Sequence, residues 1–412
     1  MSGPLDGLRV VELTSTVSGP FAGMMLADQG ADVIKVEPPG IGDLARYMGG
    51  MRSGMAAMFS VINRNKRSVV LDFKAQEEFK ILKRLLKTTD VLIENYRPGV
   101  VKKLGIDYEN IKATNPSIIY VSISGYGQSG PYKNIRVYDP LIQATAGSAS
   151  AQNSEQPEFF RSIVFDKVTG LIAAQAISTA LLQRERTGDG QYLPISMLNS
   201  ALYYLWPDVM WSRTLLGEGV VEAGELADYF PLFRAQDKSI CIILVADPDF
   251  VKFCDLLNSK LYEDEKFSTM QQRVKNSKLF VSEVEKILKD KEVSYLRKEL
   301  DELGIPVAVI NDLDEIHTDP QVIDQNSLVE VNHPIAGNMR MPKPPFNFLN
   351  QDIFPKSHAP ILGQHNREIL TELRVDEEEI KRMELRERDN REAMKGMILS
   401  QVANEMKKDD KT

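Results

Sequence analysis

Residues 8–40 read LRVVELTSTVSGPFAGMMLADQGADVIKVEPPG, and their pattern is the clearest indication of the fold class. The apolar run 8–13 predicts a buried strand, and 32–40 predicts a second strand that ends at two prolines. Between them, 19–31 predicts a helix that a Gly-Pro pair begins and a glycine stops. A strand, a helix and a strand within about thirty residues are typical of a parallel βαβ unit.

The same alternation continues along the chain. Further strands are predicted at 67–73, 91–96 and 117–127, with an amphipathic helix at 75–90. We therefore predict an α/β fold with a large, Rossmann-like, doubly wound domain. The G-x-G-x-x-G fingerprint of dinucleotide sites is absent, so the usual NAD site is not expected.

The second half predicts another, smaller α/β domain. Residues 171–190 read as a long buried helix, and 190–211 as a short strand followed by a second helix. A hairpin around Gln236 and Asp237, a helical stretch at 282–304 and a closing strand are expected in the small domain. We divide the chain into the first part of the large domain, a linker helix with a glycine-containing loop, the small domain, an irregular proline-rich return to the large domain, and a charged, solvated helix with a frayed tail: 1–200, 201–224, 225–315, 316–370 and 371–412.

Composition narrows the class of protein. The 412 residues carry a net charge of −8, and this lack of basic excess argues against nucleic acid as the main partner. No apolar run has membrane-spanning length, so no membrane association is expected. Cys241 and Cys254 form neither a disulfide framework nor a zinc cluster, and no metal site is predicted. These features predict a cytoplasmic protein.

Asp166 stands out because it interrupts an apolar approach in the stretch FDKVTG. It could cap the helix that follows, since aspartate is a favoured N-cap residue. It could also act as a nucleophile toward an activated acyl group. The residues alone leave both interpretations open.

Other patterns have a structural and a functional interpretation as well. The glycines of SGYGQSGPY, residues 124–132, allow either a surface turn or a close approach of the backbone to a ligand. Basic clusters within 63–74 and 94–105 follow predicted strands and could hold phosphates or simply face solvent. The aromatic residues of 201–211 are interpreted as core residues of a buried helix rather than as a pocket.

Taken in order, several long stretches resemble the class III CoA-transferases, a family that includes formyl-CoA transferase, carnitine CoA-transferase and α-methylacyl-CoA racemase. The resemblance spans about 4–370. It rests on the stretches LDGLRVVELTSTVSGPFAGMMLADQGADVIKVEPPGIGDLAR, NRNKRSVVLDFK, ENYRPGVVKKLGIDYENIKATNPSIIYVSISGYGQSGPY, VYDPLIQATAG, FDKVTGLIAAQAISTALLQRERTGDGQYLPISML and APILGQHNREIL.

The resemblance implies a fold, an activity and a partner. Two subunits would be threaded through each other as an interlaced homodimer. The catalytic aspartate of the family maps onto Asp166, which would carry CoA as an aspartyl-CoA thioester between an acyl-CoA donor and a carboxylic acid acceptor. Coenzyme A thioesters would be substrates, and no permanently bound cofactor is expected.

The family's other site residues map onto this chain position by position. Lys103 stands where the family has arginine, which keeps the charge but not the bidentate geometry, and Arg136 replaces a lysine. Gly125 and Gly127, and then Gly217 and Gly219, fall in the family's active-site loops. The implied CoA contacts are Val17, Ser18, Leu71, Lys74, Lys103, Arg136 and Tyr138.

Two alternative functions remain. The racemase branch uses a histidine and an aspartate as two bases, but the histidine position is Tyr138 here, and no histidine precedes His317. A tyrosine, with an ordinary pKa near about 10, is a poor substitute base. The second alternative is a non-catalytic acyl-CoA-binding subunit, against which the presence of Asp166 argues.

Overall fold

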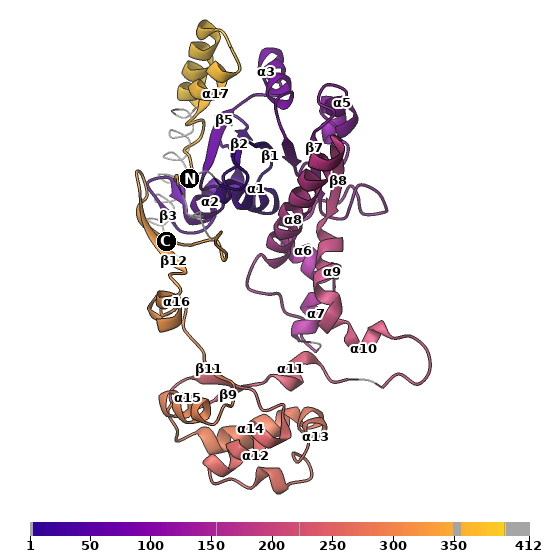
Figure 1. Ribbon diagram of the computed structural model, residues 1–412, viewed down its shortest axis with the longest axis vertical. Helices are drawn as coiled ribbons and strands as arrows, with labels where there is room; N and C mark the ends of the chain where they lie inside the picture. The colour runs from indigo at the N-terminus through magenta and orange to yellow at the C-terminus, as the bar shows by residue number, and fades with distance from the viewer. Residues whose placement is uncertain (1–2, 154, 222, 349–355, 391, 393–412) are drawn as a thin grey trace, which may run out of the picture. The chain divides into compact units, whose positions relative to one another are not determined.

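The chain forms two compact units in this computed structural model (Figure 1). The large unit combines Met1–Tyr204 with Asn326–Thr412, and the small unit is Leu205–Gln325. The structure describes residues 3–153, 155–221, 223–348, 356–390 and 392.

A six-stranded parallel sheet is the centre of the large unit. Its strand order is β5-β2-β1-β6-β7-β8, so the chain first moves outward from β1 and then returns to add strands on its other side. That reversal is the topology of doubly wound nucleotide-binding folds. The predicted α/β architecture with a parallel sheet is confirmed. The strands are β1 (Arg9–Leu13), β2 (Asp32–Glu37), β5 (Lys66–Val70), β6 (Val91–Glu94), β7 (Ile119–Ser124) and β8 (Gln191–Ser196).

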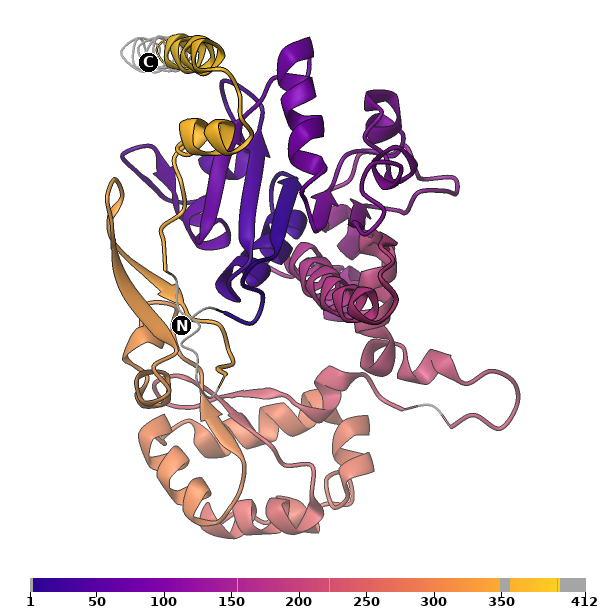
Figure 2. The same ribbon diagram turned by 45° about the horizontal axis from the view of Figure 1, so that its top comes forward.

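Helices cover both faces of this sheet, because its strands are apolar on both sides. Val10 of β1 packs in one hydrophobic cluster with helices α1 and α8, whereas Val11 packs in another with α3 and α17. Figure 2 shows α1 and α8 on one side of the sheet. The helices and 3₁₀ turn of this unit, with α9 crossing into the small unit, are α1 (Ser18–Asp28), η1 (Leu44–Tyr47), α2 (Ala57–Ile62), α3 (Gln76–Leu86), α4 (Val100–Leu104), α5 (Tyr108–Lys112), α6 (Asp139–Thr145), α7 (Ser148–Gln152), α8 (Val164–Thr187), α9 (Met197–Val209) and α17 (Asn366–Glu372).

Several sequence-based boundaries need correction. Helix α8 begins at Val164, seven residues before the predicted start, because a side chain from another helix caps it, as described below. The segment 316–370 is not wholly irregular, because β12 (Leu328–His333) pairs with β13 (Gly337–Pro342) in an antiparallel hairpin. A second short hairpin joins β3 (Met51–Arg52) to β4 (Met55–Ala56).

The charged end of the chain is not simply a solvated helix. A helix spans 377–390, and its Ile380 and Met383 are buried in the same cluster as α3. Arg386 on this helix also pairs with the buried carboxylate of Glu78. The predicted frayed tail falls on 391 and 393–412, which lie outside the described residues.

The small unit is an antiparallel three-stranded sheet, ordered β11-β10-β9, with helices packed on it. The predicted hairpin around Gln236 and Asp237 joins β9 to β10. The stretch predicted to be helical at 282–304 contains two helices, α14 and α15, with a break between them. Its elements are α10 (Trp211–Thr214), α11 (Leu226–Tyr229), β9 (Leu232–Arg234), β10 (Ser239–Ile242), α12 (Asp247–Leu256), η2 (Leu261–Glu263), α13 (Met270–Lys275), α14 (Ser277–Leu288), α15 (Val293–Glu302), β11 (Val307–Val309), η3 (Ile316–Thr318) and α16 (Pro320–Asp324).

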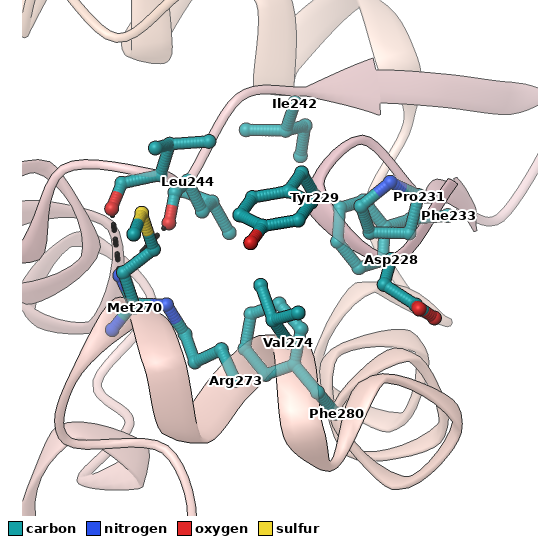
Figure 3. Close-up of a pocket in the computed structure, with 11 residues that line it drawn as sticks. Asp228, Tyr229, Pro231, Phe233, Ile242, Leu244, Met270, Arg273, Val274 and Phe280 are labelled. Carbon is teal, nitrogen blue, oxygen red and sulfur yellow. Dashed lines mark hydrogen bonds between the residues drawn. The ribbon is translucent and has the colours of Figure 1, made fainter. Parts of the chain in front are cut away.

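A small cavity of about 10 Å³ in this unit has room for little more than a water molecule (Figure 3). The ring of Tyr229 lies among Ile242, Leu244 and Val274. Arg273 on its border is buried and donates hydrogen bonds to the carbonyl oxygens of Leu244, Val245 and Phe267 and to the carboxylate of Asp247. Arg273 therefore holds together the loops of the small unit that carry these acceptors.

Replacing Arg273 with leucine is expected to destabilise the small unit by about 3 kcal/mol, because three carbonyls lose a charged donor. Urea unfolding followed by circular dichroism measures the change. Arg297→Leu is the matched control, since that arginine lies on α15 with a mostly exposed side chain. Equal unfolding midpoints for the two variants would contradict this role.

Candidate active site

A cleft of about 280 Å³ opens at the carboxyl ends of β1, β6 and β7. The direction of winding reverses between β1 and β6, and ligands bind at this point in open parallel sheets. The cleft is lined by Ser15, Thr16, Ser18, Leu44, Asn95, Tyr96, Arg97, Pro98, Ile123, Ser124, Gly125, Tyr126, Lys133, Ile135, Arg136, Val137, Tyr138, Asp166 and Met197.

Asp166 and Ser18 meet in this cleft because the first turns of α8 and α1 approach closely. A Cβ atom added at Gly170 of α8 would lie 2.8 Å from the carbonyl oxygen of Ser18, so only glycine allows this packing. The hydroxyl and the backbone N–H of Ser18 lie near enough to the Asp166 carboxylate to favour its ionised form, and both residues line the cleft. Asp166 therefore lies at the cleft beside two potential donors.

The electrostatics of Asp166 suit a reactive carboxylate. Burial, and then the nearby negative charge of Asp139, raise its pKa to about 6, while the hydrogen bonds from Ser18 act in the opposite direction. A carboxylate that is poorly solvated but still ionised at neutral pH is a better nucleophile than a fully hydrated one. A strongly perturbed group in a cleft is typical of functional sites.

Asp166 is not the cap of α8, so the capping interpretation is wrong. The N-cap residue is Ile163, and no side chain of its own caps the helix. Asp139, at the start of α6, caps it instead, because its Oδ2 accepts from the backbone N–H groups of Phe165 at 2.6 Å and Asp166 at 3.0 Å. Because Asp139 accepts from these two N–H groups, the side chain of Asp166 is not needed as a cap and can face the cleft.

The glycine loop that follows β7 approaches the site closely. A Cβ atom at Gly125 would lie 1.9 Å from a methyl group of Val137, and both residues line the cleft. Gly127 takes a left-handed conformation with φ of 98°. The loop therefore packs closely against Val137, while its approach to a ligand stays a prediction.

Three cations and one carboxylate line the cleft. Arg97, Lys133 and Arg136 are the cations, and the guanidinium of Arg136 lies 5.5 Å from the ring centre of Tyr138. Asp166 is the carboxylate. Such a lining favours an anionic ligand.

Some residues implied by the resemblance lie outside this lining. Val17 and Leu71 are buried, Leu71 in the cluster with α3. Lys74 and Lys103 are exposed, the first following β5 and the second on α4, which follows β6. Gly217 and Gly219 belong to the small unit and have φ of 99° and 81°.

The aromatic segment at 201–211 differs from the expected buried helix. Tyr203 is 80% exposed, and Tyr204 and Trp206 are also exposed. None of the four histidines lines the cleft. Among the described residues, no three His, Cys, Asp or Glu side chains are grouped to hold a metal ion, and no helix is both long and apolar enough to cross a membrane.

The sequence analysis did not identify two residues that shape the site. Asp139 precedes a proline, and Asp-Pro at the start of a short helix is a local capping signal that did not indicate its partner in α8. Asn95 accepts from the backbone N–H of Ser15 at 3.0 Å and donates to the Ser15 carbonyl at 2.9 Å. The position of Asn95 directly after β6 is the sequence feature that could have identified it as a site residue.

Comparison with known proteins identifies the class. The model of CoA-transferase family III matches residues 5–366. Succinyl-CoA:glutarate CoA-transferase of Mus musculus is 34% identical over 390 residues, which cover 92% of this chain and 89% of that protein. Acetyl-CoA:oxalate CoA-transferase of Acetobacter aceti is 34% identical over 358 residues, covering 85% of this chain and 90% of that one.

A solved structure agrees with these relatives. The crystal structure of a CAIB/BAIF family protein from Brucella suis superposes with a TM-score of 0.80 at 32% identity, covering 90% of this chain and 100% of that chain. The parallel sheet and the cleft at its switch point are thus those of an α/β enzyme of the transferase class. The chain belongs to CoA-transferase family III.

Proposed function

We propose that this enzyme moves CoA from an acyl-CoA donor to a carboxylic acid acceptor through an aspartyl-CoA thioester on Asp166. The observation that carries the proposal is the position of Asp166 in the cleft, with its carboxylate bound by Ser18 and relieved of helix capping by Asp139. The two relatives that carry names of acyl-CoA:carboxylate CoA-transferases support it.

The first half of the reaction releases the donor acid. The Asp166 carboxylate attacks the thioester carbonyl of the donor, the C–S bond breaks, and CoA leaves as a thiolate. A mixed anhydride between Asp166 and the donor acyl group remains. The thiolate then attacks the aspartyl carbonyl, which forms the aspartyl-CoA thioester and expels the donor as a carboxylate.

The second half repeats these steps in reverse order with the acceptor. The acceptor carboxylate attacks the aspartyl thioester and displaces CoA thiolate, which gives a second anhydride. The thiolate then attacks the acceptor acyl carbonyl, so the acceptor leaves as its CoA thioester and Asp166 returns as a carboxylate. No net proton is consumed, and covalent catalysis divides one difficult exchange into easier steps.

The surrounding residues have complementary proposed roles. Backbone N–H groups of the loop at Gly125 and Gly127 stabilise the oxyanions that form at each carbonyl. Arg136 and Tyr138 line the cleft, and Tyr138 would border the thioester end of the ligand. The implied CoA contacts at Val17, Ser18, Leu71, Lys74 and Lys103 follow β1, β5 and β6, whose carboxyl ends share one edge of the sheet.

An interlaced homodimer is part of the proposal. Exposed apolar side chains in and beside the segment that connects the two units support it, since monomeric surfaces rarely expose such groups together. Leu216 is 90% exposed and Val221 is 92% exposed, as a partner-covered segment would be in an isolated chain. In the family-based assignment, Gly217 and Gly219 lie in an active-site loop of this same segment.

The direct test is an acyl-CoA exchange assay. Succinyl-CoA, chosen from the names of the relatives, is mixed with the protein and a panel of carboxylic acids, and new CoA thioesters are identified by mass spectrometry. We expect a new thioester with at least one acid. Exchange of the α-proton into deuterated solvent without any new thioester would instead indicate the racemase reaction, and binding without either would indicate a non-catalytic subunit.

The pH dependence of kcat/KM should reflect the ionisation of Asp166. Because the carboxylate is the attacking form and its pKa is raised to about 6, kcat/KM should be constant above that pH and fall about tenfold per unit below it. Ser18→Ala removes a hydrogen bond that favours the ionised form, so the fall should begin at higher pH.

Ser178→Ala is the matched control, since that hydroxyl bonds to a backbone carbonyl within α8. A pH profile that is the same for the Ser18 variant and the unaltered protein would contradict the assignment.

A further inference from the structure

Four buried charged side chains form a cluster around the chain that leads from β1 into α1. Glu12, Lys35, Asp43 and Lys66 are each no more than 2% exposed, and two negative charges balance two positive ones. Lys35 Nζ lies 3.1 Å from Glu12 Oε1 and 2.8 Å from Asp43 Oδ2. Lys66 Nζ lies 3.0 Å from both oxygens of Glu12.

The members of this cluster also bind the backbone of the segment that runs from the end of β1 into the first turn of α1. Lys35 donates to the carbonyl oxygen of Thr14 at 3.0 Å, and Lys66 donates to that of Pro20 at 2.8 Å. Asp43 Oδ1 accepts from the backbone N–H of Thr16 at 2.8 Å. The segment is thus held at both ends and in its middle.

The contact at Thr16 matters because of its backbone conformation. Thr16 has a φ of 64°, a left-handed value that is unfavourable for a β-branched residue. Such strain persists only where surrounding contacts impose it, and it is common at functional sites. Two residues later the chain presents Ser18, the donor to Asp166.

We propose that Asp43 and Lys35 are positioning residues for the transfer reaction: their buried ion pair fixes Thr16 in its left-handed turn and so aims the two donors of Ser18 at Asp166. This inference rests on the proposed function of Asp166. It gives a role to charges that lie outside the cleft lining.

Charge neutralisation alone does not explain why these four charged side chains are buried together. A buried ion pair is weak evidence for stability, since a well-packed apolar pair is often as stable. The same unit contains a comparable pair, Asp28 with Arg64, whose side chains are also nearly buried and whose oxygen and nitrogen lie 2.6 Å apart. No residue of that pair lines the cleft, so it separates a structural effect from a positioning effect.

The test compares Asp43→Asn with Asp28→Asn in the full-length protein. The asparagine at position 43 places an amide NH₂ where Lys35 requires an acceptor, or turns over and offers that NH₂ to the N–H groups of Thr16 and Ala45. The first arrangement breaks the ion pair with Lys35, and the second breaks the bond to Thr16, so each weakens the hold on the turn. Asp43→Ser, whose short hydroxyl places no NH₂ group against Lys35 or Thr16, is the second variant in case the asparagine variant does not fold.

We expect kcat of Asp43→Asn to fall about 10- to 100-fold, with KM for acyl-CoA changed little, because displaced donors affect the reaction more than binding. The acid limb of its pH profile should move to higher pH, as in Ser18→Ala, and Asp43→Ser should show the same changes. Asp28→Asn should change Tm but neither kcat nor the pH profile.

The inference is overturned if Asp43→Asn and Asp28→Asn lose activity only in proportion to folded protein, with unchanged pH profiles. If Asp43→Asn does not fold, an unchanged kcat and pH profile in Asp43→Ser overturns it as well. An unaltered protein that transfers no CoA to any acid of the panel would instead refute the proposed function itself.

Discussion

Asp166→Asn is expected to lower the rate of CoA transfer by about a thousandfold or more, because an amide cannot form the anhydride and thioester intermediates. The side chain keeps its size and can still accept from Ser18. Steady-state assays with the donor and acceptor found active for the unaltered protein measure this loss. Glu185→Gln, an exposed carboxylate near the other end of α8, is the control and should keep full activity.

The same variant should be more stable than the unaltered protein at neutral pH. The pKa of Asp166 is higher in the folded state than its ordinary value, so ionisation in the fold costs free energy. That cost is absent below about pH 4, grows between about pH 4 and pH 6, and is constant above; at pH 7 its removal is worth roughly 3 kcal/mol. An inactive variant with an unchanged or raised Tm excludes misfolding, whereas an active variant contradicts the nucleophile assignment.

Asp139→Ala should destabilise the large unit by about 3 kcal/mol, since the first turn of α8 loses an acceptor for two backbone N–H groups. Gln143 would lose its partner at Asp139 Oδ1 as well. Thermal unfolding followed by circular dichroism measures the change, at a pH where both carboxylates are ionised.

Asp139→Asn separates the two roles of this residue. Its amide oxygen can still accept from the α8 donors, so we expect a loss of only about 1 kcal/mol. The negative charge beside Asp166 is gone, and the pKa of Asp166 should therefore fall and move the acid limb of activity to lower pH. Unfolding of the alanine variant at the same temperature as the unaltered protein would contradict the capping role.

Local patterns in the sequence were sufficient to predict the strands of the six-stranded sheet, but not the two short hairpins of the large unit. The run at 8–13 is apolar at successive positions, and in the fold Val10 and Val11 face opposite helical layers. Its place between β2 and β6 could not be read from periodicity, because strand order depends on which strands pair across the sheet. The alternation of strands and helices indicated a doubly wound sheet, and the resemblance to the family implied the same topology.

The errors arose where a residue depends on a partner distant in sequence. The start of α8 was placed too late because its cap is Asp139, twenty-five residues before Val164. The helix 377–390 was expected to be solvated because it is highly charged, yet Ile380 and Met383 pack on a cluster formed much earlier in the chain. Charge composition does not reveal such a contact.

The candidate site was predictable only in part. Asp166 attracted attention as a carboxylate in an apolar context, but its contact with Ser18 depends on the close approach of α1 and α8 at Gly170. The charged cluster around Asp43 was not foreseen, since its members come from β1, β2, β5 and the loop after β2. Each of them, taken alone, looks like an ordinary charged residue.

Intact-mass spectrometry after mixing the protein with succinyl-CoA, with and without hydroxylamine, tests most directly whether Asp166 carries CoA. Hydroxylamine attacks an acylated or thioesterified carboxyl and leaves a hydroxamate on it. We predict an adduct that maps to the peptide containing Asp166 and is absent from Asp166→Asn. Rapid CoA transfer with no adduct on that peptide, and undiminished transfer by Asp166→Asn, would contradict this role of Asp166.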